Sequence, residues 1–170
     1  MDGHPDLVPL RVVDVRLELP SNQPIVLLKE LDGDRYLPIW IGAPEATSIA
    51  TALEKVTTPR PLTHDLLRSV IDVLGAVASR VVITEMRDSI FFADITFDAQ
   101  GKEVAVSSRP SDAIALAVRT GTPIFASPAV LDEAAVIIEE EVDQEEELAR
   151  FREFLSDVTV EDFLGGEGDD

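Results

Sequence analysis

The chain has 170 residues, 45% of them hydrophobic and 28% charged, which suits one globular domain with a buried core. It has no cysteine and two histidines, which excludes a disulfide scaffold, a thiol nucleophile and a Cys-ligated or His-rich metal site. The formal net charge is −19, so any action on nucleic acid needs a local basic patch. No apolar stretch approaches the roughly 18 residues of a membrane span. The first residues lack the pattern of a secretory signal, so we expect a cytoplasmic protein without membrane association.

The first third of the chain is predicted to form antiparallel strands. Apolar and polar residues alternate over 11–19, which predicts a half-buried strand. A second strand is expected at 25–30, a hairpin turn at 32–34 and a third strand at 35–41, where Pro38 indicates an edge or a bulge. The expected inward-facing residues of the first strand are Val13, Val15, Leu17 and Leu19.

Two helices follow. The first opens near Pro44, and its buried stripe is predicted to be Ile49, Leu53 and Val56. The second is predicted to begin with Thr63 as its N-cap and to end at Gly75. Its apolar face is predicted from helical spacing to be Leu66, Leu67, Val70, Ile71 and Leu74.

The rest of the domain returns to strands and ends in an acidic segment. Strands are expected at 79–85, 90–97 and 103–107, then a helix opened by Pro110 and ended by Gly121, then a short strand at 123–126. Residues 131–170 carry 16 of the 33 acidic residues and 2 of the 14 basic ones. A short amphipathic helix is expected there, formed by Phe151, Phe154, Leu155 and Val158.

This order of elements predicts an α+β fold with an antiparallel or mixed sheet and helices packed on it. We expect the domain to span residues 8–135. Residues 136–170 are expected to form an acidic C-terminal helical segment with a flexible end.

Three polar clusters interrupt the core pattern. Glu45, in the first turn of a helix, could ligate a metal or hold an arginine, or simply favour the helix dipole. Arg60, His64 and Asp65 form the second cluster. A histidine beside an aspartate can shuttle protons near neutral pH, although both residues could instead cap and pack the helix start.

The third cluster is Arg109, Ser111 and Asp112 at another helix start. Free N–H groups, a serine and an arginine there form a possible phosphate site, and Asp112 could face a metal. In the alternative, Ser108 or Ser111 caps the helix while Arg109 and Asp112 pair.

Three segments in this order resemble the bifunctional nuclease domain family, over about residues 10–135. They are Leu37–Gly42 followed by Glu45 and Ala46, then Arg60–Leu66, then Arg109–Ala117 followed by Pro123 and Ile124. The resemblance implies a bacterial protein with an α+β fold, a homodimer and cleavage of DNA and RNA. The family pattern usually has an aspartate where this chain has Ser107, so one potential metal ligand is missing.

We therefore expect a nuclease that hydrolyses phosphodiester bonds with the help of Mg²⁺ or Mn²⁺. The expected catalytic residues are His64, Asp65 and Asp112. The expected substrate-binding residues are Arg60, Arg109 and Ser111. The expected metal ligands are Glu45, Asp65 and Asp112.

A non-catalytic dimeric binding or regulatory module is the alternative. Arg60 or Arg109 would then be deeply buried and paired with Asp65 or Asp112, stapling the helix starts to the sheet. In either case the acidic C-terminal segment could serve as a surface for a protein partner, or as a cover over a basic patch.

Overall fold

The computed structural model describes residues 6–139 and 148–153. The chain divides into two compact units, one ending at Ile137 and the other starting at Ile138. In the second unit, residues 148–153 are helical and exposed, and the rest of the helix expected around Phe151 lies outside the described residues. No helix in the described ranges is long and apolar enough to cross a membrane.

The first unit is built on one mixed sheet of eight strands within the described residues, which confirms the predicted α+β class. Its strand order is β6-β5-β4-β7-β1-β2-β3-β8, and β4 with β7 is the parallel pair. The strands are β1 (Val8–Glu18), β2 (Gln23–Glu30), β3 (Arg35–Trp40), β4 (Ala76–Arg87), β5 (Ile90–Ala99), β6 (Lys102–Ser108), β7 (Ile124–Ala126) and β8 (Val136–Ile137).

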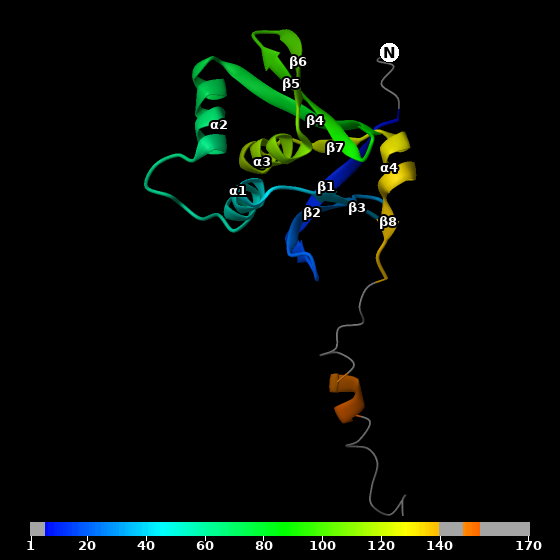
Figure 1. Ribbon diagram of the computed structural model, residues 1–170. Helices are drawn as coiled ribbons and strands as arrows, with labels where there is room; N and C mark the ends of the chain where they lie inside the picture. Colours follow the sequence, from blue (N-terminus) through cyan, green and yellow to red (C-terminus); the bar gives the residue numbers. More distant parts are fainter. Residues whose placement is uncertain (1–5, 140–147, 154–170) are drawn as a thin grey trace, which may run out of the picture. The chain divides into compact units, whose positions relative to one another are not determined.

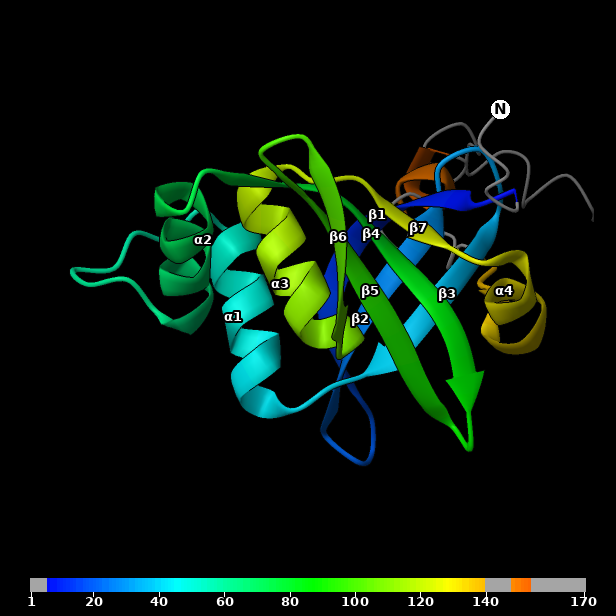
Figure 2. The same ribbon diagram turned by 90° about the horizontal axis from the view of Figure 1, so that it is seen from above.

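The helices are α1 (Ala43–Leu53), α2 (Thr63–Val73), α3 (Pro110–Thr120) and α4 (Pro128–Ala134). In both views α1 and α3 lie side by side, and α3 also contacts α2 (Figures 1 and 2). Helix α4 is not predicted from the sequence, because its seven residues are too few to show a helical apolar period. Its buried Val130 and Leu131 nevertheless pack it onto the core.

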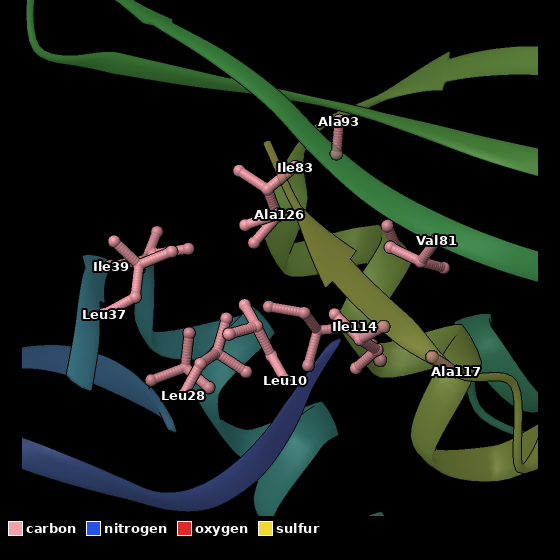
Figure 3. Close-up of a cluster of buried hydrophobic side chains, with 14 of the residues drawn as sticks. Leu10, Leu28, Leu37, Ile39, Val81, Ile83, Ala93, Ile114, Ala117 and Ala126 are labelled. Atoms are coloured by element: carbon pink, nitrogen blue, oxygen red, sulfur yellow. The ribbon is translucent and has the colours of Figure 1, made fainter. Parts of the chain in front are cut away.

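The core lies between the sheet and α3. Figure 3 shows side chains from the strands meeting those of α3. Ala113 through Ala117 of α3 are all buried, and the small alanines let this helix approach both the sheet and α1 closely. This burial fixes the start of α3, where the third polar cluster lies.

The prediction for the edge of the sheet is confirmed at Pro38. Strand β8 pairs with β3 only at Arg35 and Tyr36, so Pro38 lies past the end of β8. A proline has no N–H to donate, and it is tolerated where no outer strand needs one.

The predicted inward face of the first strand is partly wrong. A bulge between Val12 and Asp14 shifts the alternation, so Val12 and Val15 both pack against the core. Leu17 and Leu19 are exposed, because the end of β1 and the turn after it extend past the core.

The predicted buried faces of both early helices also need correction. Leu53 and Val56 are exposed, which leaves Ile49 as the buried member of that stripe. The N-cap of α2 is Leu62 rather than Thr63.

The expected apolar face of α2 is turned largely outward. The exposed apolar residues are Leu66, Leu67, Val70 and Val73 of the helix and Leu74 directly after it. The helix instead turns His64 and Ile71, two turns apart, toward the rest of the domain, and Arg68 donates from Nη1 to the carbonyl of Arg119 at 2.7 Å. Polar contacts, rather than leucines, therefore attach α2 to α3.

Candidate functional site

A pocket of about 550 Å³ lies where α1, α2 and α3 begin. Each helix starts from an extended residue, and α1 and α3 have a proline in the first turn that favours the helical backbone. The residues of this pocket that can do chemistry are Glu45 and Ser48 of α1, His64 of α2, and Arg109 and Asp112 at the start of α3. We call it the helix-start pocket.

His64 is held at both ring nitrogens. Its Nε2 lies 2.9 Å from Oδ1 of Asp112, and its Nδ1 lies 2.7 Å from Oγ of Ser48. Because a carboxylate only accepts hydrogen bonds, Nε2 carries a proton, and in the neutral form of the ring Nδ1 accepts a hydrogen bond from the Ser48 hydroxyl. The His64 side chain is 10% exposed, and its two contacts hold the ring in one orientation.

Asp112 is the carboxylate that orients this histidine. Burial alone would raise the pKa of Asp112, but hydrogen bonds from Arg109 and His64 outweigh burial, and the pKa is lowered. The carboxylate is therefore ionised at neutral pH and can stabilise a protonated imidazole beside it.

Arg109 bridges two acidic residues of the pocket. Its Nε donates to Oδ2 of Asp112 at 2.8 Å, and its Nη2 donates to Oε1 of Glu45 at 3.1 Å. The hydrogen bond to Asp112 is the main cause of a raised pKa of Arg109, and the contact with Glu45 adds to it. The Arg109 side chain is still 64% exposed, so its other N–H donors face solvent and can bind a phosphate.

Asp65 has different partners from its neighbour His64. Its Oδ1 accepts from Nε of Arg119 at 2.7 Å, and its Oδ2 accepts from the backbone N–H of Leu62 at 3.0 Å. The hydrogen bond from Arg119 is the main cause of a lowered pKa of Asp65, and the one from the backbone of Leu62 adds to it.

Arg119 is only 5% exposed, and it also donates to the carbonyls of Ala115 and Ser48. One buried guanidinium thus joins α1, α2 and α3. We call Asp65 and Arg119, with these carbonyls, the helix tie.

Residues 26–139 match the model of the bifunctional nuclease domain. The chain belongs to the bifunctional nuclease domain family. An uncharacterized protein of Mycobacterium tuberculosis is 46% identical over 161 residues, covering 91% of this chain and 96% of that protein.

The named plant relatives are more distant. Bifunctional nuclease 1 of Oryza sativa subsp. indica is 29% identical over 117 residues, covering 67% of this chain and 35% of that protein. Bifunctional nuclease 1 of Arabidopsis thaliana is 30% identical over 108 residues, covering 61% of this chain and 33% of that protein. The match spans about a third of each plant protein.

The structure thus brings four of the predicted site residues of this bifunctional nuclease domain together: Glu45, His64, Arg109 and Asp112. Asp65 is next to them in the chain but belongs to the helix tie. Arg60 is exposed in the loop before α2 and is not among the residues lining the helix-start pocket.

Ser111 is buried and lines a second pocket, which also contains Arg109. It does not cap α3, which has no side-chain cap, and Ser108 Oγ donates to the carbonyl of Arg109 instead. The pairing of Arg109 with Asp112 that the alternative required is present.

The three predicted metal ligands do not form one ligand set in this arrangement. Glu45 and Asp112 share the guanidinium of Arg109, and Asp65 binds Arg119. Across 6–139 and 148–153, no three His, Asp or Glu side chains are grouped so that they could hold a metal ion. The use of Mg²⁺ or Mn²⁺ stays a prediction.

Two residues of this region were missed by the sequence analysis, Ser48 and Arg119. Ser48 follows Glu45 by three positions in α1, and Arg119 follows Asp112 by seven in α3. Each pair therefore lies on one face of its helix. Searching that face one or two turns beyond Glu45 and Asp112 would have pointed to Ser48 and Arg119.

Proposed function

We propose that this chain hydrolyses phosphodiester bonds of DNA or RNA in the helix-start pocket. The observation that carries the proposal is the exposed guanidinium of Arg109 beside the His64–Asp112 pair. The plant relatives named bifunctional nucleases support the same reaction class. Arg109 is paired with Glu45 and Asp112, so its contribution to phosphate binding comes from its exposed N–H donors rather than from a net positive charge of the pocket.

In the proposed reaction, Arg109 binds a non-bridging oxygen of the phosphate and offsets the charge that develops in the transition state. A water attacks phosphorus and passes its proton to the Ser48 hydroxyl, whose own proton moves to Nδ1 of His64. Ionised Asp112 stabilises the imidazolium, and the leaving oxygen takes a proton from solvent.

A non-catalytic binding module is the second candidate, and one specific observation favours it. Both ring nitrogens of His64 are satisfied by protein groups, and the buried guanidinium of Arg119 in the helix tie joins three helices, as expected of residues with a structural role. In this case the helix-start pocket would bind a ligand without changing it.

Cleavage by highly purified protein separates the two candidates. Linear and circular DNA and RNA are incubated with Mg²⁺, Mn²⁺ or EDTA, alongside His64→Gln and the matched α2 control Asp72→Asn. The proposal expects cleavage that falls roughly 100-fold in His64→Gln and is unchanged in the control. Equal cleavage by wild type and His64→Gln would point to a contaminant and contradict the proposal. No cleavage by any sample would favour the binding module.

We propose also that the chain forms a homodimer in which the outward apolar residues of α2 are covered, because so many apolar side chains on one helix are costly in water. Light scattering tests this: wild type is expected at twice the monomer mass and Val70→Glu at the monomer mass. A monomeric wild type would contradict it.

The cytoplasmic location and the protein partner of the acidic segment stay predictions.

A further inference from the structure

A second pocket, of about 370 Å³, adjoins the first through Arg109, which lines both. Its size lies within the range of roughly 300–1,000 Å³ typical of sites for small molecules. The walls of this pocket are mostly apolar and include Ile39, Trp40, Ile90 and Phe91. Ser111, two residues after Arg109 in the chain, also lines it. An arginine next to an apolar pocket suits a ligand with an anionic and a flat apolar part. We call it the aromatic pocket.

Trp40 is the feature of this pocket that needs an explanation. It is the last residue of β3, it is the only tryptophan of the chain, and it is 50% exposed. Its Nε1 donates to Oε2 of Glu18 at 2.8 Å. The indole is therefore held in one orientation with much of its surface open, as expected of a ring that receives a ligand rather than one that fills the core.

We propose that the aromatic pocket receives an unstacked nucleobase, which stacks on Trp40 while Arg109 holds the adjoining phosphate. This inference rests on the proposed function. Because Arg109 lines both pockets, a phosphate bound to it has the reacting groups on one side and the indole on the other. Every base has a flat π-face, so such a subsite accepts DNA and RNA of any sequence. A duplex must first release a base, so single strands are preferred.

Fluorescence of Trp40 tests this without any need for cleavage, since no other tryptophan contributes. The full chain is titrated with short single-stranded oligothymidine in EDTA, and again with Ca²⁺. Saturable quenching is expected, and an abasic oligomer of equal length should quench far less. A duplex of equal length should bind more weakly than the single strand. Equal quenching by the abasic and the oligothymidine strands would overturn the inference.

Variants measure the contribution of the ring to affinity, by anisotropy of a fluorescein-labelled oligomer. Trp40→Leu is expected to weaken binding about tenfold, and Trp40→Phe, which keeps a stacking face, should restore most of it. Val77→Ala, which changes an exposed apolar residue of β4 outside both pockets, is the matched control and should leave affinity unchanged. Unchanged affinity in Trp40→Leu would overturn the inference.

Failure of this inference can be told apart from failure of the proposed function. Quenching by oligothymidine without cleavage would support the base-binding subsite and contradict the nuclease. Cleavage that survives in Trp40→Leu with unaltered affinity would overturn the subsite and leave the nuclease standing. If no nucleic acid binds, both are overturned, and a protein partner becomes the occupant to seek.

Discussion

His64 and Asp65 are neighbours in the chain, yet their side chains contact residues of opposite charge on α3. His64 Nε2 lies 2.9 Å from Asp112, and Asp65 accepts from Arg119 at 2.7 Å. Consecutive residues of a helix point about 100° apart, and Asp112 and Arg119 are two turns apart, so the contacts do not overlap. One acidic residue, Asp112, orients the histidine of the pocket, and the other, Asp65, joins the helices.

Removing the carboxylate of the helix tie should cost stability. Asp65→Ala leaves the buried guanidinium of Arg119 without its counter-charge, and we expect the free energy of unfolding to fall by about 3 kcal/mol. The control is Asp72→Ala, which breaks an exposed pair with Arg68 on the same helix and should cost at most about 0.5 kcal/mol. Urea denaturation measures both, and equal losses would contradict the role of the helix tie.

The same carboxylate predicts how stability depends on pH. The pKa of Asp65 is lowered in the folded state, so its contribution is complete above the ordinary value of about 3.9 and is lost as pH falls through the folded pKa. Asp112 acts in the same direction. Below about pH 4 the free energy of unfolding should fall for wild type and less steeply for Asp65→Asn. Parallel curves from denaturation at several pH values would contradict this.

The fold was largely predictable because its long elements carry clear periods. Alternation marked the strands, and Pro110 with Gly121 marked both ends of α3. The errors arose where tertiary packing decides. The bulge after Val12 reversed the alternation of β1, and the polar attachment of α2 left Val70 exposed.

The site was predictable only in part for a related reason. The motifs marked the helix starts, which the fold then brings together at the helix-start pocket. Which aspartate meets His64 depends on how α2 is rotated against α3, and no local pattern encodes that rotation. Helical periodicity places Ser48 and Arg119 on the faces of the motif residues, but which groups they contact appears only in the packing of the helices.

Ser48 should matter through the histidine it contacts. Ser48→Ala removes the hydroxyl at Nδ1 of His64, and we expect kcat to fall about tenfold with KM unchanged and the pH–rate profile displaced. Thr51→Ala removes an exposed hydroxyl of the same helix and serves as control. A change confined to stability, with kcat and the pH profile intact, would show that Ser48 is only structural.

Arg109 should contribute one phosphate contact. Arg109→Gln is expected to weaken oligonucleotide binding and to reduce the slope of log affinity against log salt by about 0.7, as for one phosphate on a single strand. Arg16→Gln removes a similarly exposed arginine from β1 and should leave the slope unchanged. Anisotropy titrations over a range of salt give the slopes, and the same slope in all three proteins would contradict the assignment.

The most direct test of the division between the two aspartates is the nuclease activity of Asp112→Asn and Asp65→Asn, each expressed per folded molecule. Asparagine keeps the shape of the side chain and removes its charge. We predict that Asp112→Asn loses activity roughly 100-fold, because His64 loses its orienting carboxylate, while Asp65→Asn stays within about twofold of wild type. Full activity in Asp112→Asn, or an equal loss in both variants, would contradict the assignment of the helix-start pocket as the active site.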